Sequence, residues 1–220
     1  RDGLMLVIDK PAGIPVHAGP GGGPNIEDGF DSLKFGLPKR PHLAHRLDRD
    51  TSGCLVLGRH TKALSRLGKL FESKRIEKTY LAILPIALEG NGVIDASLAK
   101  VHKWKGWKMK VAEPGDEGAQ ETITDYKVLH SEGGQSLVAF YPKTGRTHQI
   151  RVHALHAFGA AILGDTLYGT DEDKKQPRLY LHASAITLPL YPKKDPITVE
   201  APIPAEFLAL PVVDKWVLNL

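Results

Sequence analysis

Short apolar runs with the composition of β-strands follow one another along most of this chain, with few helical segments between them. These runs combine aliphatic, β-branched and aromatic residues, and they end at glycine, proline or charged residues. They are residues 4–8, 54–57, 80–84, 93–97, 108–112, 121–129, 136–141, 179–188 and 197–201. Strands that succeed one another directly favour an antiparallel arrangement over a doubly wound parallel one. The sequence therefore predicts an α+β fold, built on a mixed, largely antiparallel β-sheet flanked by helices and loops.

Helices are predicted at four places. Residues 62–74 give the clearest pattern, because apolar residues recur at helical spacing on one face and basic residues fill the other. Residues 147–158 predict a second helix, with Gly159 at the position of a C-terminal cap. Shorter helices are expected at residues 25–35 and after Pro204.

The chain shows no internal repeat and no clear domain boundary, so we expect residues 1–220 to form one catalytic domain. Its length and its 42% hydrophobic content suffice for a core. No run of about 18 apolar residues occurs, so no membrane span is expected. A single cysteine, Cys54, excludes an internal disulfide framework, and no signal-peptide pattern is visible. We therefore expect a cytoplasmic monomer, and because the chain begins at Arg1 we suspect that a further segment precedes it.

Positive charge is concentrated in two segments. Residues 34–78 contain twelve Lys and Arg against four Asp and Glu, and this excess favours a surface that binds nucleic acid. The second segment, residues 102–110, alternates lysines with Trp104 and Trp107 and contains no acid. These indoles could stack on unpaired bases, or they could pack inward, and the sequence leaves both interpretations open.

The stretch of residues 42–58 places a carboxylate, Asp48, between Arg46 and Arg49 at the entry to an apolar strand. From local chemistry alone, the simpler interpretation is a turn residue that caps nearby N–H groups. The flanking cations would nevertheless keep Asp48 ionised and would attract an anion to it.

Five blocks, taken together and in order, resemble the signature motifs of RluA-type pseudouridine synthases. The resemblance runs from about Leu4 to Pro202, and it departs from the family pattern only in small ways, at Asp9 and Cys54. The blocks are His45-Arg46-Leu47-Asp48 with Thr51-Ser52-Gly53, Lys78-Thr79-Tyr80, Gly145-Arg146-Thr147-His148-Gln149-Ile150-Arg151-Val152-His153, Gly164-Asp165-x-x-Tyr168-Gly169 and Leu181-His182-Ala183.

The resemblance implies an enzyme that isomerises specific uridines of RNA, in large-subunit ribosomal RNA or in tRNA, without a cofactor. It implies that Asp48 is the catalytic carboxylate, which either attacks C1′ or assists glycal formation by removing the 2′ proton. Tyr80 matches the family's active-site tyrosine, although a strand tyrosine is by default a core residue. Arg151 matches the family's basic partner of the catalytic carboxylate, whereas the helix pattern alone suggests a solvent-facing charge.

The same resemblance assigns Arg46 to base flipping, because it matches the arginine that fills the gap left by the extruded uridine. Arg146, His148 and Lys10 are weaker candidates for contacts with phosphate or with loops. Several histidines lie near these blocks, but no cysteine accompanies them and their spacing does not share one helical face, so no metal site is expected.

Two further function classes compete with this interpretation. A catalytically inactive RNA-binding module could retain the fold, but it would not need Asp48, Tyr80 and Arg151 together. A nuclease or another hydrolase would require paired carboxylates or a metal cluster, and neither is convincing here.

Overall fold

The computed structural model describes residues 1–19, 22–103 and 106–218, which divide into two compact units. Unit 1 consists of Arg1–Lys78 and Ala183–Pro202. Unit 2 consists of Thr79–His182 and Ile203–Leu220. Each unit has its own hydrophobic core.

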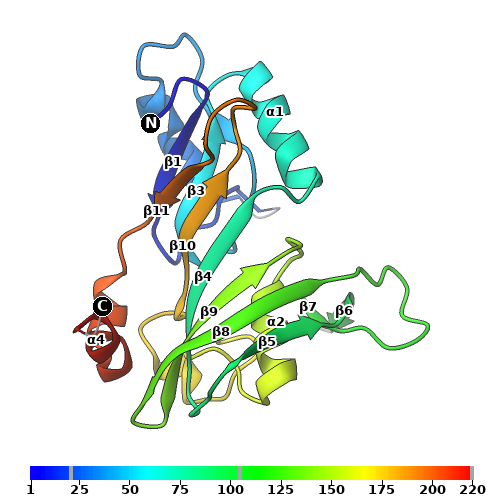
Figure 1. The fold of residues 1–220 in the computed structure, drawn as a ribbon. Helices are drawn as coiled ribbons and strands as arrows, with labels where there is room; N and C mark the ends of the chain where they lie inside the picture. The colour runs from blue at the N-terminus through cyan, green and yellow to red at the C-terminus, as the bar shows by residue number, and fades with distance from the viewer. Residues whose placement is uncertain (20–21, 104–105, 219–220) are drawn as a thin grey trace. The chain divides into compact units, whose positions relative to one another are not determined.

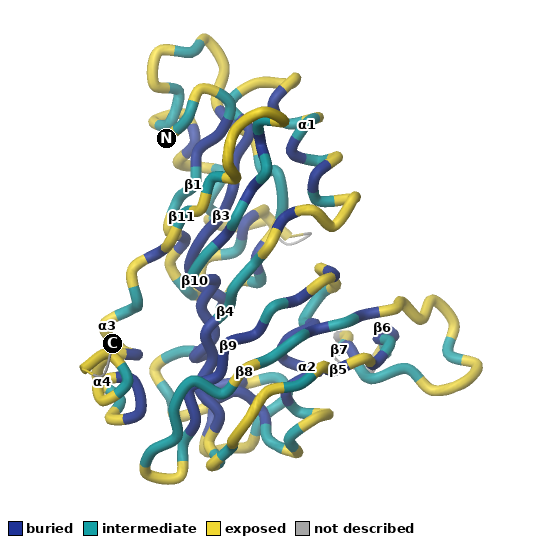
Figure 2. The backbone as a smooth tube through the Cα atoms, viewed as in Figure 1, coloured by how far each residue is buried: buried dark blue, intermediate teal, exposed yellow. Residues whose placement is uncertain are grey.

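Unit 1 is built around one strand, β3, all of whose residues are buried (Figures 1 and 2). Strands β1 and β2 each pair antiparallel with β3, and β11 pairs antiparallel with β10, the next strand in the sheet. Helix α1 packs against β3. The elements are β1 (Met5–Lys10), the 3-10 helix η1 (Ile26–Leu33), β2 (His42–Leu43), β3 (Ser52–Gly58), α1 (Thr61–Glu72), β10 (Leu181–Leu188, from Ala183 onward in this unit) and β11 (Ile197–Glu200).

A glycine allows β3 to pass close to β10. Gly53 has a φ of 108°, and a Cβ built on it would lie 2.2 Å from the carbonyl oxygen of Ala183. Any side chain would therefore collide with the neighbouring backbone, in a conformation that side chains also disfavour. This close approach lies at the start of β3, five residues after Asp48.

Unit 2 is an antiparallel sheet with the strand order β4-β9-β8-β5, accompanied by a separate hairpin of β6 and β7. Residues 80–84 of β4 and residues 137–141 of β9 are continuous apolar runs in the sequence. The elements are β4 (Glu77–Leu84), β5 (Asn91–Asp95), β6 (Leu98–Lys103), β7 (Gly106–Val111), β8 (Ile123–Glu132), β9 (Gln135–Pro142), α2 (Gln149–Phe158), the 3-10 helix η2 (Asp173–Lys175), α3 (Ala205–Leu208) and α4 (Pro211–Leu218).

The continuous apolar character of β4 follows from burial on both of its faces. Ala82 and Leu84 join a core cluster with residues of α2, whereas Leu81 and Ile83 join a second cluster with residues of α3 and α4. Because side chains alternate between the two faces of a strand, both sets must be apolar when helices cover both faces.

The predicted fold class is confirmed, since a mostly antiparallel sheet with helices is observed. The helices predicted at residues 62–74 and 147–158 are present as α1 and α2, and Gly159 caps α2 with a φ of 67°. Strand β6 was not predicted. The division into units does not test whether residues 1–220 act as one catalytic domain, which stays a prediction. In the part of the chain that the structure describes, no helix combines the length and apolar character that crossing a membrane requires.

Candidate active-site residues in the two units

In the loop that carries Asp48 in unit 1, successive side chains alternate in burial. Arg46 is exposed, Leu47 is 5% exposed and points into the unit, and Asp48 is half-buried. Arg46 and Asp48 therefore project to the same side, as their spacing predicts. The turn that follows is closed by the backbone amide of Thr51, which donates to the carbonyl oxygen of Asp48 at 3.2 Å. The hydrogen bond that closes this turn thus leaves the carboxylate unused.

Lys10 is fully buried, and its side chain forms hydrogen bonds with the backbone of this loop. Its Nζ donates to the carbonyl oxygens of Pro11 at 2.7 Å, Ile14 at 2.8 Å and Arg49 at 2.9 Å. An ammonium group has three donors, and here each meets a backbone acceptor. Because Arg49 directly follows Asp48, Lys10 fixes the backbone beside the candidate carboxylate. This placement matches the loop contact, which is one of the two roles expected for Lys10.

His45 anchors the other side of the loop to β3 and α1. Its Nε2 accepts a hydrogen bond from the backbone amide of Val56 at 3.0 Å, and its ring stacks on Phe71 with centroids 4.8 Å apart. Burial, followed by the nearby charge of Lys78, lowers the pKa of His45 to about 4. The imidazole is therefore neutral at pH 7, which is the state that can accept from Val56. The sequence analysis assigned no role to His45.

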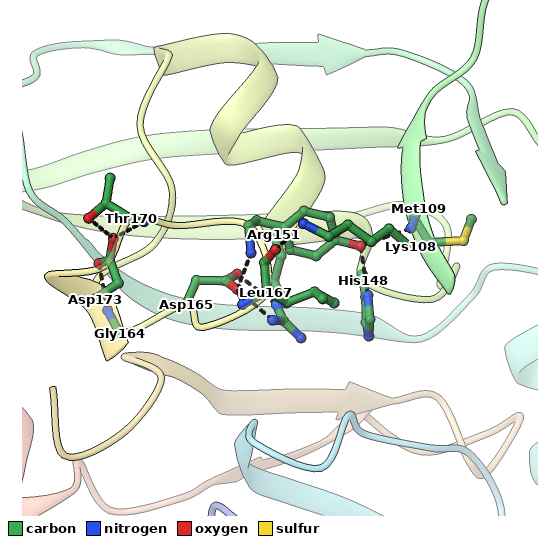
Figure 3. A network of polar contacts seen from close by, with 10 residues as sticks. Lys108, Met109, His148, Arg151, Gly164, Asp165, Leu167, Thr170 and Asp173 are labelled. Carbon is green, nitrogen blue, oxygen red and sulfur yellow. Dashed lines mark hydrogen bonds and ion pairs between the residues drawn. The ribbon is translucent and has the colours of Figure 1, made fainter. Parts of the chain in front are cut away.

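Arg151 in unit 2 is buried, with 4% of its surface exposed, so the interpretation as a solvent-facing charge is wrong. Its Nε donates to Oδ2 of Asp165 at 2.7 Å and its Nη2 donates to Oδ1 at 2.6 Å (Figure 3). This bidentate geometry is the strong form of an Arg–carboxylate pair, and Asp165 takes two of the five guanidinium donors. The pairing of Arg151 with Asp48 that the resemblance implies joins residues of different units, and it stays a prediction.

Asp165 is oriented by the backbone that follows it. Its Oδ1 also accepts from the amides of Leu167 and Tyr168, each at 2.9 Å. The preceding Gly164 has a φ of 78°, and a Cβ there would lie 1.8 Å from the carbonyl oxygen of Arg178. The carboxylate that holds Arg151 is therefore itself held by a turn that requires glycine.

Asp173 closes the same loop from its far end. Its Oδ1 accepts from the amide of Gly164 at 3.1 Å, and its Oδ2 accepts from both the amide and the hydroxyl of Thr170, at 2.7 and 2.9 Å (Figure 3). A Cβ on Gly169 would lie 2.4 Å from Asp173 Oδ2, so this contact also excludes a side chain. The block Gly164-Asp165-x-x-Tyr168-Gly169 thus folds into a compact support for Arg151.

Tyr168 links this support to β7 and to the start of α2. The Arg151 guanidinium lies 5.1 Å from the centre of its ring, and the Lys108 ammonium lies 5.5 Å from it. Its hydroxyl accepts from the backbone amide of Met109 at 3.0 Å and bonds to Nδ1 of His148 at 2.8 Å. The tyrosine therefore connects Arg151 to the β6–β7 hairpin and to His148, the residue that directly precedes α2.

The His148 side chain contacts other residues of unit 2, whereas the Arg146 side chain is exposed. His148 has a φ of 55°, and its ring stacks on Trp107 at 5.3 Å with an interplanar angle of 18°. Arg146 is exposed, and its backbone amide donates to Oε1 of Gln149 at 3.0 Å. The RNA contacts predicted for Arg146 and His148 stay predictions. Trp104 of the second basic segment lies outside the described residues.

Tyr80 lies on β4, opposite Phe140 of β9, and is half-buried. Its ring packs against the core cluster that includes α2. Tyr80 therefore makes core contacts, as expected for a strand tyrosine. Its catalytic role stays a prediction.

His153, one of the histidines near the family motifs, is held by hydrogen bonds to three residues of its surroundings. His153 is fully buried; its Nδ1 contacts Thr124 Oγ1 at 2.9 Å, and its Nε2 contacts Thr122 Oγ1 at 2.9 Å and the Ala96 carbonyl oxygen at 3.0 Å. Burial lowers its pKa. Across residues 1–19, 22–103 and 106–218, no group of three or more His, Cys, Asp or Glu side chains is arranged to hold a metal ion.

Comparisons with known proteins show which family this chain is similar to. Residues 4–156 match the family described as RNA pseudouridylate synthase. An uncharacterized RNA pseudouridine synthase of Zymomonas mobilis is 43% identical over 211 residues, which cover 95% of this chain and 94% of that protein. The ribosomal large subunit pseudouridine synthase C of Buchnera aphidicola (Acyrthosiphon pisum) is 34% identical, over 94% of this chain and 67% of its own length.

A solved structure shows the same fold. The human RNA pseudouridylate synthase domain containing 4 matches with a TM-score of 0.77 at 27% identity, covering 94% of this chain and 88% of its own. The family match extends over both the Asp48 loop and the Arg151 helix. The chain therefore belongs to the RluA-type family of RNA pseudouridine synthases.

Proposed function

We propose that this RNA pseudouridine synthase modifies specific uridines of large-subunit ribosomal RNA, with Asp48 as its catalytic carboxylate. The RNA assignment draws on the names of its relatives, which include ribosomal large subunit pseudouridine synthases C and D of Buchnera and Nitrosomonas. A transfer RNA is the alternative substrate. The observation that supports Asp48 most directly is that Lys10 and His45 hold its loop through hydrogen bonds while Asp48 itself stays half-buried.

The reaction conserves all atoms of the nucleotide. The C1′–N1 bond breaks, a C1′–C5 bond forms, the C5 proton leaves and N1 gains a proton. Asp48 either attacks C1′ and forms a covalent sugar ester, or removes the C2′ proton so that a glycal forms. In both routes a carboxylate that is held in place lowers the entropic cost of reaching the reacting carbon.

Arg151 and Tyr80 take supporting roles in this proposal. Arg151 supplies the cation that keeps the catalytic carboxylate ionised, and its bond to Asp165 fixes the plane of its guanidinium. Tyr80 stacks on the extruded uracil and assists proton transfer at C5. Both units contribute residues to this list, so we propose that residues 1–220 act as one catalytic domain.

Arg46 is proposed to enter the base stack when the target uridine leaves it. Its exposed side chain projects to the same side of the loop as Asp48. Arg146 is exposed and suits a phosphate contact, and His148 presents its ring at the start of α2. Lys10 acts indirectly, through the backbone of the Asp48 loop.

Tritium release from RNA labelled at C5 of uridine, without added metal, tests the chemistry. The wild-type protein should release tritium, and Asp48→Asn should abolish the release while RNA affinity stays within a few fold, because phosphate contacts supply most of the binding. Asp50→Asn is the matched control, since Asp50 lies two residues away and makes only a loose 3.8 Å contact with Arg49. Release by Asp48→Asn at the wild-type rate would refute the assignment. RNA binding by a wild-type protein that releases no tritium would instead indicate an inactive module.

The RNA target and the assembly state need separate experiments. Mapping of pseudouridines in ribosomal and transfer RNA from a strain that lacks the gene should reveal a missing site in the large-subunit rRNA. Sedimentation should give the mass of one chain, as expected for a monomer, and fluorescent tagging should place the protein in the cytoplasm.

A further inference from the structure

We propose that Trp107 on the β6–β7 hairpin is a stacking platform for an unpaired RNA base near the target uridine. This inference rests on the RNA substrate of the proposed function, but it concerns a separate contact. It decides between the two interpretations that the sequence left open for Trp107, base stacking and inward packing.

The indole of Trp107 is exposed although the hairpin that carries it is anchored. Trp107 is 41% exposed, whereas Met109 on the same strand is 9% exposed and packs with Leu98 and Val152. Trp107 lies on the same face of β7 as Met109, because the two are two residues apart, but near the start of the strand it is less covered than Met109. A large exposed aromatic ring on an anchored strand is a common element of single-stranded RNA recognition.

The ring of Trp107 is also held in a fixed orientation. His148 stacks on it at 5.3 Å and 18°, and His148 is itself bonded to the Tyr168 hydroxyl at 2.8 Å. A base that stacks on this indole meets a surface that is already ordered. Preorganisation of this kind reduces the entropic cost of binding.

The second neighbour of the indole is a residue that RNA can displace. The ammonium of Lys100 lies 4.8 Å from the centre of the Trp107 ring, and Lys100 is exposed. An exposed cation–π contact shifts an equilibrium by about 2- to 5-fold, whereas stacking of a base on an aromatic side chain shifts it by about 5- to 150-fold. Base stacking therefore prevails, and the displaced ammonium is placed to meet a phosphate of the same nucleotide.

The charge around the platform favours a polyanion. Residues 98–112 contain five lysines and no acid. Among them, Lys110 is paired with Glu113 and Asp116, and Lys108 donates to the Leu167 carbonyl oxygen. Lys100 is exposed and forms no ion pair with a carboxylate among the described residues, so it is suited to contact phosphate.

The platform lies close to the candidate catalytic arginine within unit 2. The Trp107 and His148 rings are 5.3 Å apart, the His148 and Tyr168 rings are 5.5 Å apart, and Arg151 lies 5.1 Å from the Tyr168 ring. A nucleotide on Trp107 would therefore be only a few positions from the nucleotide that reaches Arg151. The occupant is a base that flanks the target and not the target itself.

Binding of a fluorescein-labelled oligouridine, alone and annealed to oligoadenosine, tests the proposal. Trp107→Leu should weaken binding of the single strand by about 10-fold or more and should leave duplex binding within about 2-fold, because paired bases cannot stack on the indole. Trp107→Phe should recover part of the loss. Val93→Ala is the matched control, since Val93 is 64% exposed on β5 of the same unit.

The salt dependence of the same binding separates stacking from charge. Trp107→Leu should keep the wild-type slope of log K against log salt, whereas Lys100→Ala should reduce that slope by about one unit. In tritium-release assays on ribosomal RNA, the loss in Trp107→Leu should appear in KM and not in kcat. Urea unfolding of both Trp107 variants provides the folding control.

Several outcomes would overturn the platform. They are equal single-strand binding by Trp107→Leu and wild type, equal losses on single strand and duplex, or a fall in kcat without a change in affinity. Failure of the wild-type protein to release tritium would count against the proposed function alone, because oligouridine binding does not depend on turnover.

Discussion

Asp165 provides the strongest test of how unit 2 holds Arg151, because the pair is almost completely removed from water. Arg151 is 4% exposed and Asp165 is fully buried, and their two hydrogen bonds measure 2.7 and 2.6 Å. In Asp165→Asn, the amide oxygen can still accept from Leu167 and Tyr168, but the amide nitrogen faces a guanidinium donor. The substitution thus removes the negative charge that accepts two hydrogen bonds from the buried guanidinium.

The expected loss of stability follows from the loss of this buried ion pair. Removal of one partner of a buried ion pair typically costs about 3–5 kcal/mol, because the remaining charge keeps its desolvation penalty. Urea unfolding at pH 7 should therefore show a decrease of this size in the free energy of unfolding. Tritium release should fall more steeply than RNA affinity, since Arg151 loses the partner that fixes its orientation.

A control lies in the same loop. Asp171 pairs with Lys174 at 2.6 Å, but its side chain is 89% exposed, so Asp171→Asn should have the unfolding curve of wild type. The double variant Arg151→Met, Asp165→Leu should regain part of the stability that Asp165→Asn loses, because it buries no charge. Equal unfolding free energies for wild type and Asp165→Asn would refute the reasoning.

Three further predictions concern the Asp48 loop. Lys10→Met should lower the melting temperature and the rate of tritium release without weakening RNA binding, because three backbone carbonyl oxygens lose their buried donor; a change in the salt dependence of RNA binding would contradict this. His45 has a folded pKa of about 4 against about 6.5 unfolded, so its contribution of about 3 kcal/mol should be present above pH 6.5 and be lost as the pH falls to 4. His45→Gln should flatten that part of the urea-unfolding profile against pH, and an unchanged profile would disprove the assignment. Arg46→Ala should reduce activity more on a structured stem-loop than on a short unstructured oligonucleotide, whereas equal losses would favour a phosphate contact.

The strands that could be predicted from the sequence are those whose own residues form a clear apolar run. Residues 80–84 and 136–141 lie in strands β4 and β9 of the structure. A short apolar run that is bounded by turn-forming residues is typical of a buried strand. Strand β6 was missed because Leu98–Lys103 mixes basic and apolar residues without the clean pattern of a buried strand. Its partner β7 and the anchor residue Val152 on α2 supply its packing, and neither is visible from the segment itself.

The burial of Arg151 was missed for a different reason. A prediction from helical periodicity assumes that one face of the helix is exposed to solvent. In α2, however, every residue from Gln149 to Ala154 is buried. An arginine can occupy such a helix only if a carboxylate meets it, and Asp165 lies fourteen positions away in a loop. The hydrogen bonds of Lys10 could not be predicted either, because its partners are backbone carbonyl oxygens, which every residue type provides.

The contacts inside the units separate the residues that support the candidate site from the residue proposed to act in it. Lys10, His45 and Asp165 each make hydrogen bonds that hold the local backbone or Arg151 in place, so their substitution changes folding and chemistry together. Asp48 differs, because the bond that closes its turn uses the backbone carbonyl oxygen, which asparagine also has. Asp48→Asn should therefore keep this turn, so a loss of tritium release in that variant can be attributed to the missing negative charge. The family motifs contain both kinds of residue, and only the structure shows which of them can be tested without disturbing the fold.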